Sequence, residues 1–436
     1  MAAVAVTPRC FLFIHQNFPG QYRHLATALL ARGDRLVAIG GPSAQPLKGV
    51  ELHQYDPMPA AGVPACHPWA ADLQTKAIRA EAVGKLLAGL LQAEFSPDLV
   101  IGHSGWGELL AIKDLLPQVP VLHQVEWIYQ LQGGDTNFDP EFSSLDWQAQ
   151  SCLRLRRAPQ LMALQDLDWG LSPTKWQAST VPVEYRNRLS IIHEGIDTTT
   201  ICPKSGSGLS LQKAGLQFEA GAELVTFVAR NLEPYRGFHV FMRMLPALQQ
   251  LRPKAHVVIV GGENVSYGQP APNGMSWKQT LLQELNGQLD LSRIHFVGKI
   301  PHPLLHELFR ICACHAYLSY PFVLSWSMLE AMSCGAVVVG SATPPVEEVI
   351  EHGRNGLLVN FFDQQAWAHT IAAVLENPTA HKHLGVAARQ TIIERYDLHS
   401  SCLPQQLKLI DKLIIQGCSS DQGVSLEQGS AANAAI

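Results

Sequence analysis

Short, wholly apolar segments alternate with amphipathic ones along most of the chain. The first apolar segment covers residues 10–14, and apolar side chains then recur between Tyr22 and Leu30 at the spacing of one helical face. Gly33 ends this predicted helix, and residues 35–39 form the next predicted strand. Continuous apolar strands joined by amphipathic helices are typical of a parallel sheet with helices on both faces.

The same alternation predicts two separate sheets. A segment rich in Pro, Ser and Gly, residues 203–208, interrupts the pattern and is interpreted as a linker. The further predicted strands are residues 99–101, 121–122 and 190–192 before the linker, and 224–228, 256–260, 294–297, 317–318 and 337–339 after it. The predicted helices of the second half include residues 238–250, 277–289, 364–376 and 381–396. The pattern therefore indicates an α/β protein with two Rossmann-like, doubly wound domains.

We predict four parts along the chain from this pattern. They are an N-terminal domain (1–200), a C-terminal domain (201–392), a closing helix (393–416) and a disordered tail (417–436). The closing helix carries apolar residues at helical spacing between Leu403 and Ile414, and we expect it to pack back on the N-terminal domain. The tail is rich in Ser, Gln, Gly and Ala.

Composition excludes several classes of protein. The 436 residues are 47% hydrophobic and 16% charged, with a formal net charge of -5, which argues against a nucleic-acid partner. The nine cysteines form no C-x-x-C pair, the 18 histidines show no convincing metal-ligand spacing, and no apolar run reaches the roughly 18 residues of a membrane span. We expect a cytoplasmic protein without a bound metal, with peripheral contact to the inner face of a membrane as an option.

Two arginines follow the first strand of the second half. Arg230 and Arg236 lie between this strand and the next helix, where two guanidinium groups and a helix N-terminus would suit a diphosphate. The alternative, two solvated surface arginines, is equally compatible with their position. Residues 319–335 form a second candidate loop, in which Ser325 and Ser327 could cap a helix that carries Glu330 one turn inside. A carboxylate there can accept hydrogen bonds from vicinal hydroxyls, although a helix-surface charge is the simpler interpretation of an isolated glutamate.

Weaker signals lie elsewhere. Gly20 stands in the turn after the first strand, and His103 follows another strand among glycines. Val297 and Gly298 end a strand and could present backbone groups to a nucleobase. A G-x-G-x-x-G motif is absent from the sequence after the first strand of either half, which disfavours a dehydrogenase. Residues 124–140, aromatic and acidic, are a candidate acceptor-pocket segment, and a packed loop is as good an interpretation.

Taken together, these motifs resemble family 4 glycosyltransferases, which are retaining enzymes of GT-B fold. The resemblance is strongest over residues 225–359, in the run LEAMSCG at 329–335 and the run HGRNGLLV at 352–359, and is weaker over residues 11–192. It implies two domains facing a central cleft, with the acceptor domain N-terminal and the nucleotide-sugar donor domain C-terminal.

The resemblance also implies roles for individual residues. Arg230 and Arg236 would bind the donor diphosphate, and His103 would lie near the transferred sugar. Glu330 matches the second carboxylate of the family's E-x7-E motif, which holds the donor ribose, whereas Phe322 replaces the first. The remaining donor-binding positions would be Gly20, Val297, Gly298, Ser325, Trp326 and Ser327.

The expected activity is retaining, metal-independent transfer of a sugar from a nucleotide-diphosphate sugar to a hydroxyl acceptor. The acceptor would be a saccharide or lipid-linked glycan in cell-surface polysaccharide or glycolipid biosynthesis, and no cofactor is expected besides the donor substrate. Cationic groups and helix N–H groups can stabilise the charge that grows on a departing diphosphate. Two alternatives stay open: a catalytically silent GT-B partner or scaffold protein, which Phe322 favours, and a GT-B sugar-nucleotide epimerase.

Overall fold

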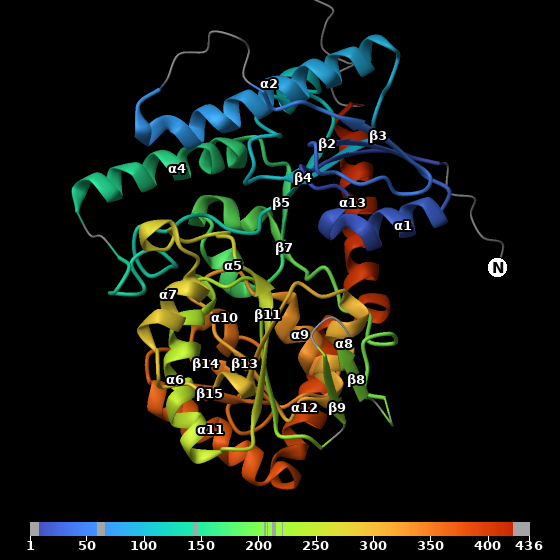
Figure 1. The fold of residues 1–436 in the computed structure, drawn as a ribbon. Helices are drawn as coiled ribbons and strands as arrows, with labels where there is room; N and C mark the ends of the chain where they lie inside the picture. Colours follow the sequence, from blue (N-terminus) through green and yellow to red (C-terminus); the bar gives the residue numbers. More distant parts are fainter. Residues whose placement is uncertain are drawn as a thin grey trace, which may run out of the picture. The chain divides into compact units, whose positions relative to one another are not determined.

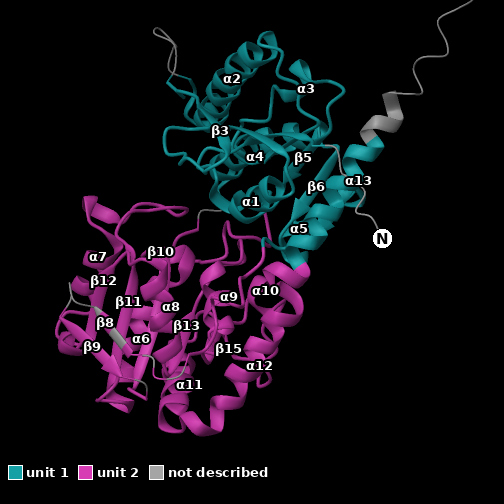
Figure 2. Cartoon of the chain, turned by 90° about the vertical axis from the view of Figure 1, so that its right-hand side faces the viewer, with its two compact units in different colours: residues 1–131, 145–194, 402–436 teal, residues 132–144, 195–401 magenta. Residues whose placement is uncertain are grey.

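The chain consists of two compact α/β units (Figures 1 and 2). The computed structural model describes residues 8–58, 66–143, 146–204, 206, 208–211, 215–219 and 221–421. Unit 1 comprises residues 1–131, 145–194 and 402–436, and unit 2 comprises residues 132–144 and 195–401. Of the described helices, none is both long and apolar enough to cross a membrane.

Unit 1 is built on a seven-stranded parallel sheet of order β3-β2-β1-β4-β5-β6-β7. Its strands are β1 (Cys10–Ile14), β2 (Arg35–Gly40), β3 (Val50–Gln54), β4 (Leu99–His103), β5 (Val121–Gln124), β6 (Trp169–Ser172) and β7 (Leu189–Ile191). Its helices are α1 (Arg23–Ala31), α2 (Ala71–Gln92), α3 (Ile112–Leu115), α4 (Trp147–Gln165), α5 (Lys175–Ser179) and α13 (Leu403–Asp421).

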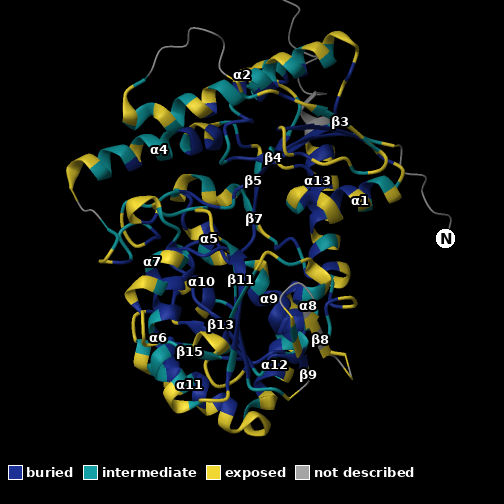
Figure 3. Ribbon diagram, viewed as in Figure 1, coloured by how far each residue is buried: buried dark blue, intermediate teal, exposed yellow. Residues whose placement is uncertain are grey.

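The apolar character of β1 follows from helices on both faces of this sheet. Phe11 and Phe13 pack with residues of α1 and α13 on one face, among them Leu29 and Ile410. Leu12 and Ile14 alternate with them and pack against residues of α2 on the other face. The five inner strands are accordingly buried along most of their length, whereas the edge strands β3 and β7 are partly exposed (Figure 3).

Unit 2 holds a six-stranded parallel sheet of order β12-β11-β10-β13-β14-β15 and a separate antiparallel pair, β8 and β9. The strands are β8 (Gly208–Leu211), β9 (Leu216–Glu219), β10 (Leu224–Asn231), β11 (His256–Gly262), β12 (Ile294–Gly298), β13 (Cys314–Tyr317), β14 (Val338–Ser341) and β15 (Leu357–Val359). The helices are α6 (Phe238–Leu251), α7 (Trp277–Glu284), α8 (His302–Ile311), α9 (Trp326–Ser333), α10 (Pro344–Glu347), α11 (Gln364–Glu376) and α12 (Pro378–Tyr396). Helices α6 and α11 lie together on one side of the sheet, and α8, α9 and α12 lie on the other (Figure 1).

Several expectations about boundaries differ from the structure. The long segment of unit 2 begins at Gly195 rather than at residue 201, and the end of the expected linker 203–208 starts the β8–β9 hairpin, whose pairing a local pattern does not reveal. Residues 132–144 belong to unit 2 although they lie within the first half of the sequence. Helix α7 stops at Glu284 rather than at residue 289. Helix α12 ends at Tyr396, as predicted, but begins at Pro378, and the expected domain boundary at residue 392 falls inside it.

The C-terminal helix packs within unit 1. Helix α13 begins at Leu403 and continues to Asp421, so it enters the segment for which a disordered tail was expected. Its residues Ile410, Leu413 and Ile414 are buried in the same core cluster as Phe11 and Phe13. The rest of the expected tail, residues 422–436, lies outside the described residues.

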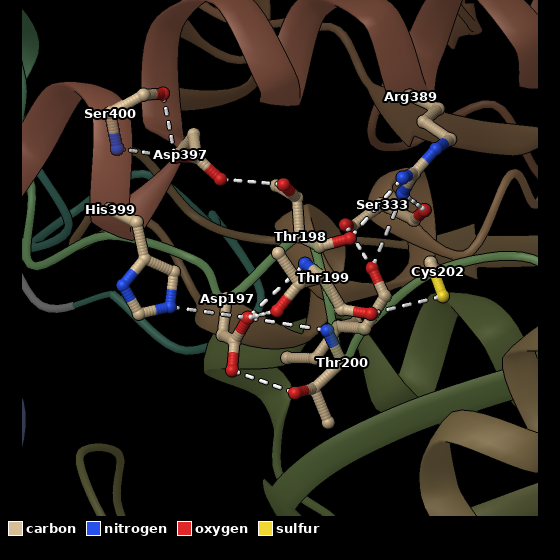
Figure 4. Close-up of polar contacts among 11 residues, drawn as sticks. Asp197, Thr198, Thr199, Thr200, Cys202, Ser333, Arg389, Asp397, His399 and Ser400 are labelled. Carbon is tan, nitrogen blue, oxygen red and sulfur yellow. Dashed lines mark hydrogen bonds and ion pairs between the residues drawn. The ribbon is translucent and has the colours of Figure 1, made fainter.

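The two ends of the long segment of unit 2 are tied to each other. Ile196 forms a parallel bridge with Asp397, and the Thr198 hydroxyl donates to the Asp397 carboxylate at 2.5 Å (Figure 4). Arg389 of α12 adds hydrogen bonds to the carbonyl oxygens of Thr198, at 3.2 Å, and Ser333, at 2.8 Å. The first and last residues of the segment 195–401 are thereby held together by contacts within unit 2.

Candidate active site

The candidate residues of each unit gather at the same kind of position in its sheet. In both sheets the first and fourth strands of the series are neighbours, β1 with β4 in unit 1 and β10 with β13 in unit 2. The chain leaves these two strands toward opposite sides of the sheet, and the carboxyl ends of such strands are where open α/β sheets bind ligands. Gly20 follows β1 and His103 is the last residue of β4, whereas Arg236 and Ser325 follow β10 and β13.

Arg236 is a buried cation whose hydrogen bonds go to uncharged groups. It ends the short helix Pro234–Arg236 before α6, and its side chain is held by the Ser319 hydroxyl at 2.8 Å and the Val323 carbonyl oxygen at 3.0 Å. Only 8% of the residue is exposed, and no carboxylate of the described part of the chain forms an ion pair with it. A buried guanidinium without a counter-ion is costly, and an anionic ligand at its open face would compensate it.

The two loops of unit 2 touch each other through this arginine. Nη1 of Arg236 lies 3.4 Å from the Tyr317 hydroxyl, and that hydroxyl also accepts a hydrogen bond from the Ser325 backbone N–H at 2.9 Å. Gly237, with a φ of +67°, follows Arg236 at the start of α6, where an added Cβ would lie 2.3 Å from the Cβ of Leu318. Glycine is required here because the two backbones come too close for a side chain.

Arg230 differs from Arg236. It is exposed near the end of β10, and no contact in the described structure joins it to Arg236. Val297 and Gly298 end β12, an edge strand separated from β10 by β11, with Val297 partly buried and Gly298 exposed at a φ of +66°. The structure therefore brings Arg236 and Ser325 together and leaves these other predicted positions without a contact to them.

Helix α9 begins with three of the predicted residues. Ser325 is its N-cap and accepts from the Ser327 backbone N–H at 3.4 Å, while the two serine hydroxyls lie 2.9 Å apart. Trp326 is 39% exposed beside them. The remaining free N–H groups of the first turn can accept an anion. Glu330 lies further along this helix and is 6% exposed, so it is not the surface charge that an isolated glutamate suggests.

Phe322 lies in an aromatic cluster instead of a polar site. Its ring packs on Tyr267 at 4.9 Å and Tyr235 at 5.6 Å between centroids, and the Arg236 guanidinium lies 5.8 Å from its centroid. Tyr267 reaches the cluster because buried Glu233 accepts hydrogen bonds from the backbone N–H groups of three successive residues, Ser266, Tyr267 and Gly268. The sequence analysis did not identify Glu233 or Tyr267. A glutamate between the two arginines was the only available signal.

A segment from the first half of the sequence, Gln132–Ser143, packs on unit 2. We call it the strap. Asp139 accepts from the Tyr320 hydroxyl at 2.8 Å and pairs with His239 at 2.9 Å, and Asp135 accepts from the Tyr235 hydroxyl at 2.9 Å. Burial raises the pKa of Asp139, but the hydrogen bonds from His239 and Tyr320 outweigh burial and leave that pKa below its usual value. Residues 124–140, the candidate acceptor segment, are thus divided between the two units.

Unit 1 contributes a histidine held in one tautomer. Nδ1 of His103 accepts from the Gly105 backbone N–H at 3.0 Å, so Nε2 carries the proton and faces the Glu126 carboxylate at 3.3 Å. The Trp106 ring stacks on the imidazole at a centroid distance of 5.2 Å. Glu126, 36% exposed at its side chain, is a further polar group that sequence reasoning missed.

Gly20 lies close to a second histidine. Its φ is +45°, and an added Cβ would lie 2.9 Å from the His15 ring. The His15 and His103 rings are 6.0 Å apart. Burial first, and then the neighbouring His103, lower the pKa of His15 to about 3, so this imidazole is neutral at physiological pH. Unit 1 therefore offers two imidazoles and one carboxylate at its sheet edge.

Comparisons with known proteins agree with this division into two halves. The glycosyl transferase family 4 group matches residues 32–201, and the glycosyl transferases group 1 matches residues 212–391. The D-inositol 3-phosphate glycosyltransferase of Mycolicibacterium vanbaalenii is 29% identical over 191 residues, covering 43% of this chain and 40% of that protein. The corresponding protein of a Nocardioides species is 28% identical over 213 residues, covering 46% and 44%. The matched part thus spans less than half the length of either relative.

Solved structures share the fold over nearly the whole chain. Sucrose-phosphate synthase from Thermosynechococcus elongatus superimposes with a TM-score of 0.69 at 17% identity, covering 94% of this chain and all of the other. Anabaena HepE in complex with UDP and glucose gives a TM-score of 0.64 at 20% identity, covering 93% and 99%. The expected GT-B fold of two Rossmann-like domains is therefore confirmed.

Proposed function

Because this chain belongs to family 4 of the glycosyltransferases, we propose that it transfers a sugar from a nucleotide-diphosphate sugar to a hydroxyl acceptor. We further propose that the transfer retains the anomeric configuration, uses a hexose donor and needs no metal ion. The observation that carries the proposal is Arg236, a buried cation compensated only by uncharged groups, next to the first turn of α9. Fixed positive charge at this position stabilises a departing diphosphate without reorganisation.

The other candidate residues take roles around that diphosphate. The free N–H groups of α9 would bind phosphate oxygens, and Glu330 would accept hydrogen bonds from the ribose hydroxyls. Arg230, whose side chain is exposed, would add positive charge near the phosphates. His103 would donate from Nε2 to the transferred sugar or the leaving phosphate in place of Glu126, while the Gly105 backbone N–H holds the ring through Nδ1.

The physiological setting is also proposed. The named relatives act on inositol 3-phosphate, and HepE was solved with UDP-glucose, so UDP is the first nucleotide to test. We propose a role in cell-surface polysaccharide or glycolipid assembly, in the cytoplasm and with peripheral contact to the membrane. The acceptor would bind on unit 1, on the same side of the sheet edge as His103.

The test is a binding experiment followed by a transfer assay. UDP, GDP and ADP are titrated into the full chain by calorimetry, and the nucleotide that binds is then supplied as a panel of its sugar conjugates. Arg236→Ala should weaken nucleotide binding by about tenfold or more, because a charge-assisted hydrogen bond contributes about 1.5–3 kcal/mol. Arg252→Ala is the matched control, since Arg252 follows the far end of α6 and pairs with Glu223. Equal affinity in wild type and Arg236→Ala would remove the assignment.

A catalytically silent GT-B protein is the second candidate. The observation in its favour is Phe322, which lies in the aromatic cluster where the resemblance expects a carboxylate. Nucleotide binding without sugar release or transfer, for every sugar conjugate and a range of hydroxyl acceptors, would favour this candidate over an enzyme.

A further inference from the structure

Three side chains that can ligate a metal lie close together, and one of them is Glu330, the proposed ribose carboxylate. His302 and His306 lie one turn apart on α8, and Glu330 comes from α9. Oε1 of Glu330 lies 3.9 Å from Nδ1 of His302 and 3.8 Å from Nε2 of His306. All three ligand atoms lie within 4.8 Å of one another. The sequence analysis found no metal-ligand spacing among the histidines, and this i, i+4 pair is a spacing that it overlooked.

The polar atoms of this cluster are not satisfied by one another. Separations of 3.8 and 3.9 Å are too long for hydrogen bonds. Nε2 of His306 is buried and lacks a hydrogen-bond partner among the described residues. The Glu330 side chain is 8% exposed, and none of the described donors lies within hydrogen-bond distance of its carboxylate. A buried carboxylate and a buried ring nitrogen without partners are costly, so a ligand bound between the three polar atoms would stabilise the cluster.

The donor set favours a cation of the zinc class. Two neutral imidazoles and one carboxylate are ligands that Zn²⁺ prefers, with bonds of about 2.0–2.2 Å. Bonds of that length place two ligand atoms at most about 4.2 Å apart, which includes the distances of 3.9 and 3.8 Å from Glu330 to the two histidines. His302 is 73% exposed at its side chain, so the ion can reach the site and water can complete its coordination.

The other cluster of this kind in unit 2 is already satisfied. It consists of Asp139, Glu141 and His239. Asp139 accepts from Tyr320 and pairs with His239, and Glu141 forms two hydrogen bonds with Arg243, at 2.6 and 2.8 Å. A metal ion there would have to displace these partners, whereas the cluster around Glu330 has none to lose.

We propose that His302, His306 and Glu330 form a binding site for a Zn²⁺-class cation, and that this cation competes with the donor nucleotide for Glu330. The cation site stands on the three side chains alone, while the competition rests on the proposed function of Glu330. Bound metal would neutralise the carboxylate that is to accept the ribose hydroxyls, so the metal is an inhibitor of this enzyme and has no part in its chemistry.

The first experiment measures metal binding directly and needs no activity. Zn²⁺ is titrated by calorimetry into the full chain after removal of metal with a chelator, in parallel with His306→Gln and with His383→Gln as control. His383 is an exposed histidine on α12 outside the cluster. We expect one tight site in wild type and in His383→Gln, weakened roughly tenfold or more in His306→Gln. The same tight site in His306→Gln, or its absence from wild type, would overturn the proposal.

The second experiment tests the competition. UDP is titrated into wild type and His306→Gln with and without saturating Zn²⁺. We expect Zn²⁺ to lower the apparent UDP affinity of wild type and to leave that of His306→Gln nearly unchanged. If Zn²⁺ binds at the cluster but UDP affinity stays the same in wild type, the competition is wrong. Failure of UDP to bind at all, with intact Zn²⁺ binding, would contradict the proposed function and leave the metal site standing.

Discussion

Arg236 and Glu330 are proposed to bind opposite ends of a nucleoside diphosphate, and this gives them separable effects. Arg236→Ala should weaken binding of both UDP and inorganic pyrophosphate, because the phosphates are common to both ligands. Glu330→Ala should weaken UDP binding by about tenfold and leave pyrophosphate binding unchanged, since only UDP carries a ribose. Calorimetry with the two ligands measures this. An equal loss for both ligands in Glu330→Ala would show that the residue acts through the loop and not through the ribose.

Phe322 offers a second prediction at a single position. Phe322→Glu would restore the carboxylate of the family motif, but it would place that charge in a buried cluster next to the Arg236 guanidinium. The new carboxylate would pair with Arg236 and occupy the cation that the diphosphate needs. We therefore expect UDP affinity to fall by about tenfold in Phe322→Glu and by much less in Phe322→Leu, measured by the same titration. Improved UDP affinity in Phe322→Glu would contradict this account of the cluster.

The sequence could locate the candidate residues but not their surroundings. The strands before Arg236 and Ser325 are plain from their apolar runs, and parallel sheets place such strand ends at one edge. Burial of Arg236 and Glu330 could not be predicted, because both depend on side chains distant in sequence, such as Ser319 and His306. The exposed Arg230 carries the same motif signal as Arg236, so the sequence cannot tell the two apart.

The strap is the element that sequence reasoning placed least well. Its aromatic and acidic residues were visible, but their partners are Tyr235, His239 and Tyr320 in the second half of the chain. A local sequence pattern contains no information on contacts with residues about 100–180 positions away. The short strands β8 and β9 were missed for a related reason, since four-residue strands give too short a pattern.

Asp139 joins the strap to Tyr320 and His239, so its loss should lower both the stability of the fold and the affinity for UDP. Oδ2 of Asp139 accepts from both Tyr320 and His239, and the Tyr320 backbone N–H in turn bonds to the Tyr235 carbonyl oxygen at 3.0 Å, next to Arg236. Asp139→Asn keeps the shape but removes the charge and one acceptor, so we expect the free energy of unfolding to fall by about 1–3 kcal/mol and UDP affinity to fall with it. Urea unfolding and calorimetry measure the two effects.

Glu141→Gln is the matched control on the same strap. Glu141 is 43% exposed at its side chain, and Arg243 keeps Glu284 as a partner when Glu141 is changed. Exposed ion pairs contribute little, so the unfolding free energy should change by about 0.5 kcal/mol or less. A loss in Glu141→Gln as large as that in Asp139→Asn would show that the strap is held by its ion pairs and not by the buried carboxylate.

At the scale of the whole molecule, the chain passes between the units at residues 194–195 and 401–402, and also at the two ends of the strap, at 131–132 and 144–145. In unit 1 the Gln406 side chain donates to the His193 carbonyl oxygen at 2.9 Å. In unit 2 the Thr198–Asp397 hydrogen bond (Figure 4) and the bridge between Ile196 and Asp397 hold the chain on the other side of the passages at 194–195 and 401–402. These contacts hold the backbone within each unit next to two of the four passages.

Asp197, two residues into the segment 195–401 of unit 2, should make the stability of the fold depend on pH in the acid range. Burial raises the pKa of Asp197, but hydrogen bonds from the side chains and backbone N–H groups of Thr199 and Thr200 outweigh burial and lower this pKa to about 2. A carboxyl group whose pKa is lower in the folded chain than in the unfolded one, at about 3.9, stabilises the fold above that pH. Its contribution is lost as the pH falls from about 4 to 2.

Asp197→Asn tests this pH dependence. At neutral pH the free energy of unfolding of the variant should be about 1–2 kcal/mol lower than that of wild type, because the amide makes weaker hydrogen bonds to Thr199 and Thr200. Between pH 4 and 2 that difference should shrink, since wild type loses the contribution and the amide does not titrate. Urea unfolding at a series of pH values measures it, with Glu347→Gln, an exposed carboxylate on α10, as control. A difference that stays constant down to pH 2 would mean that Asp197 stabilises the turn through its shape and not through its charge.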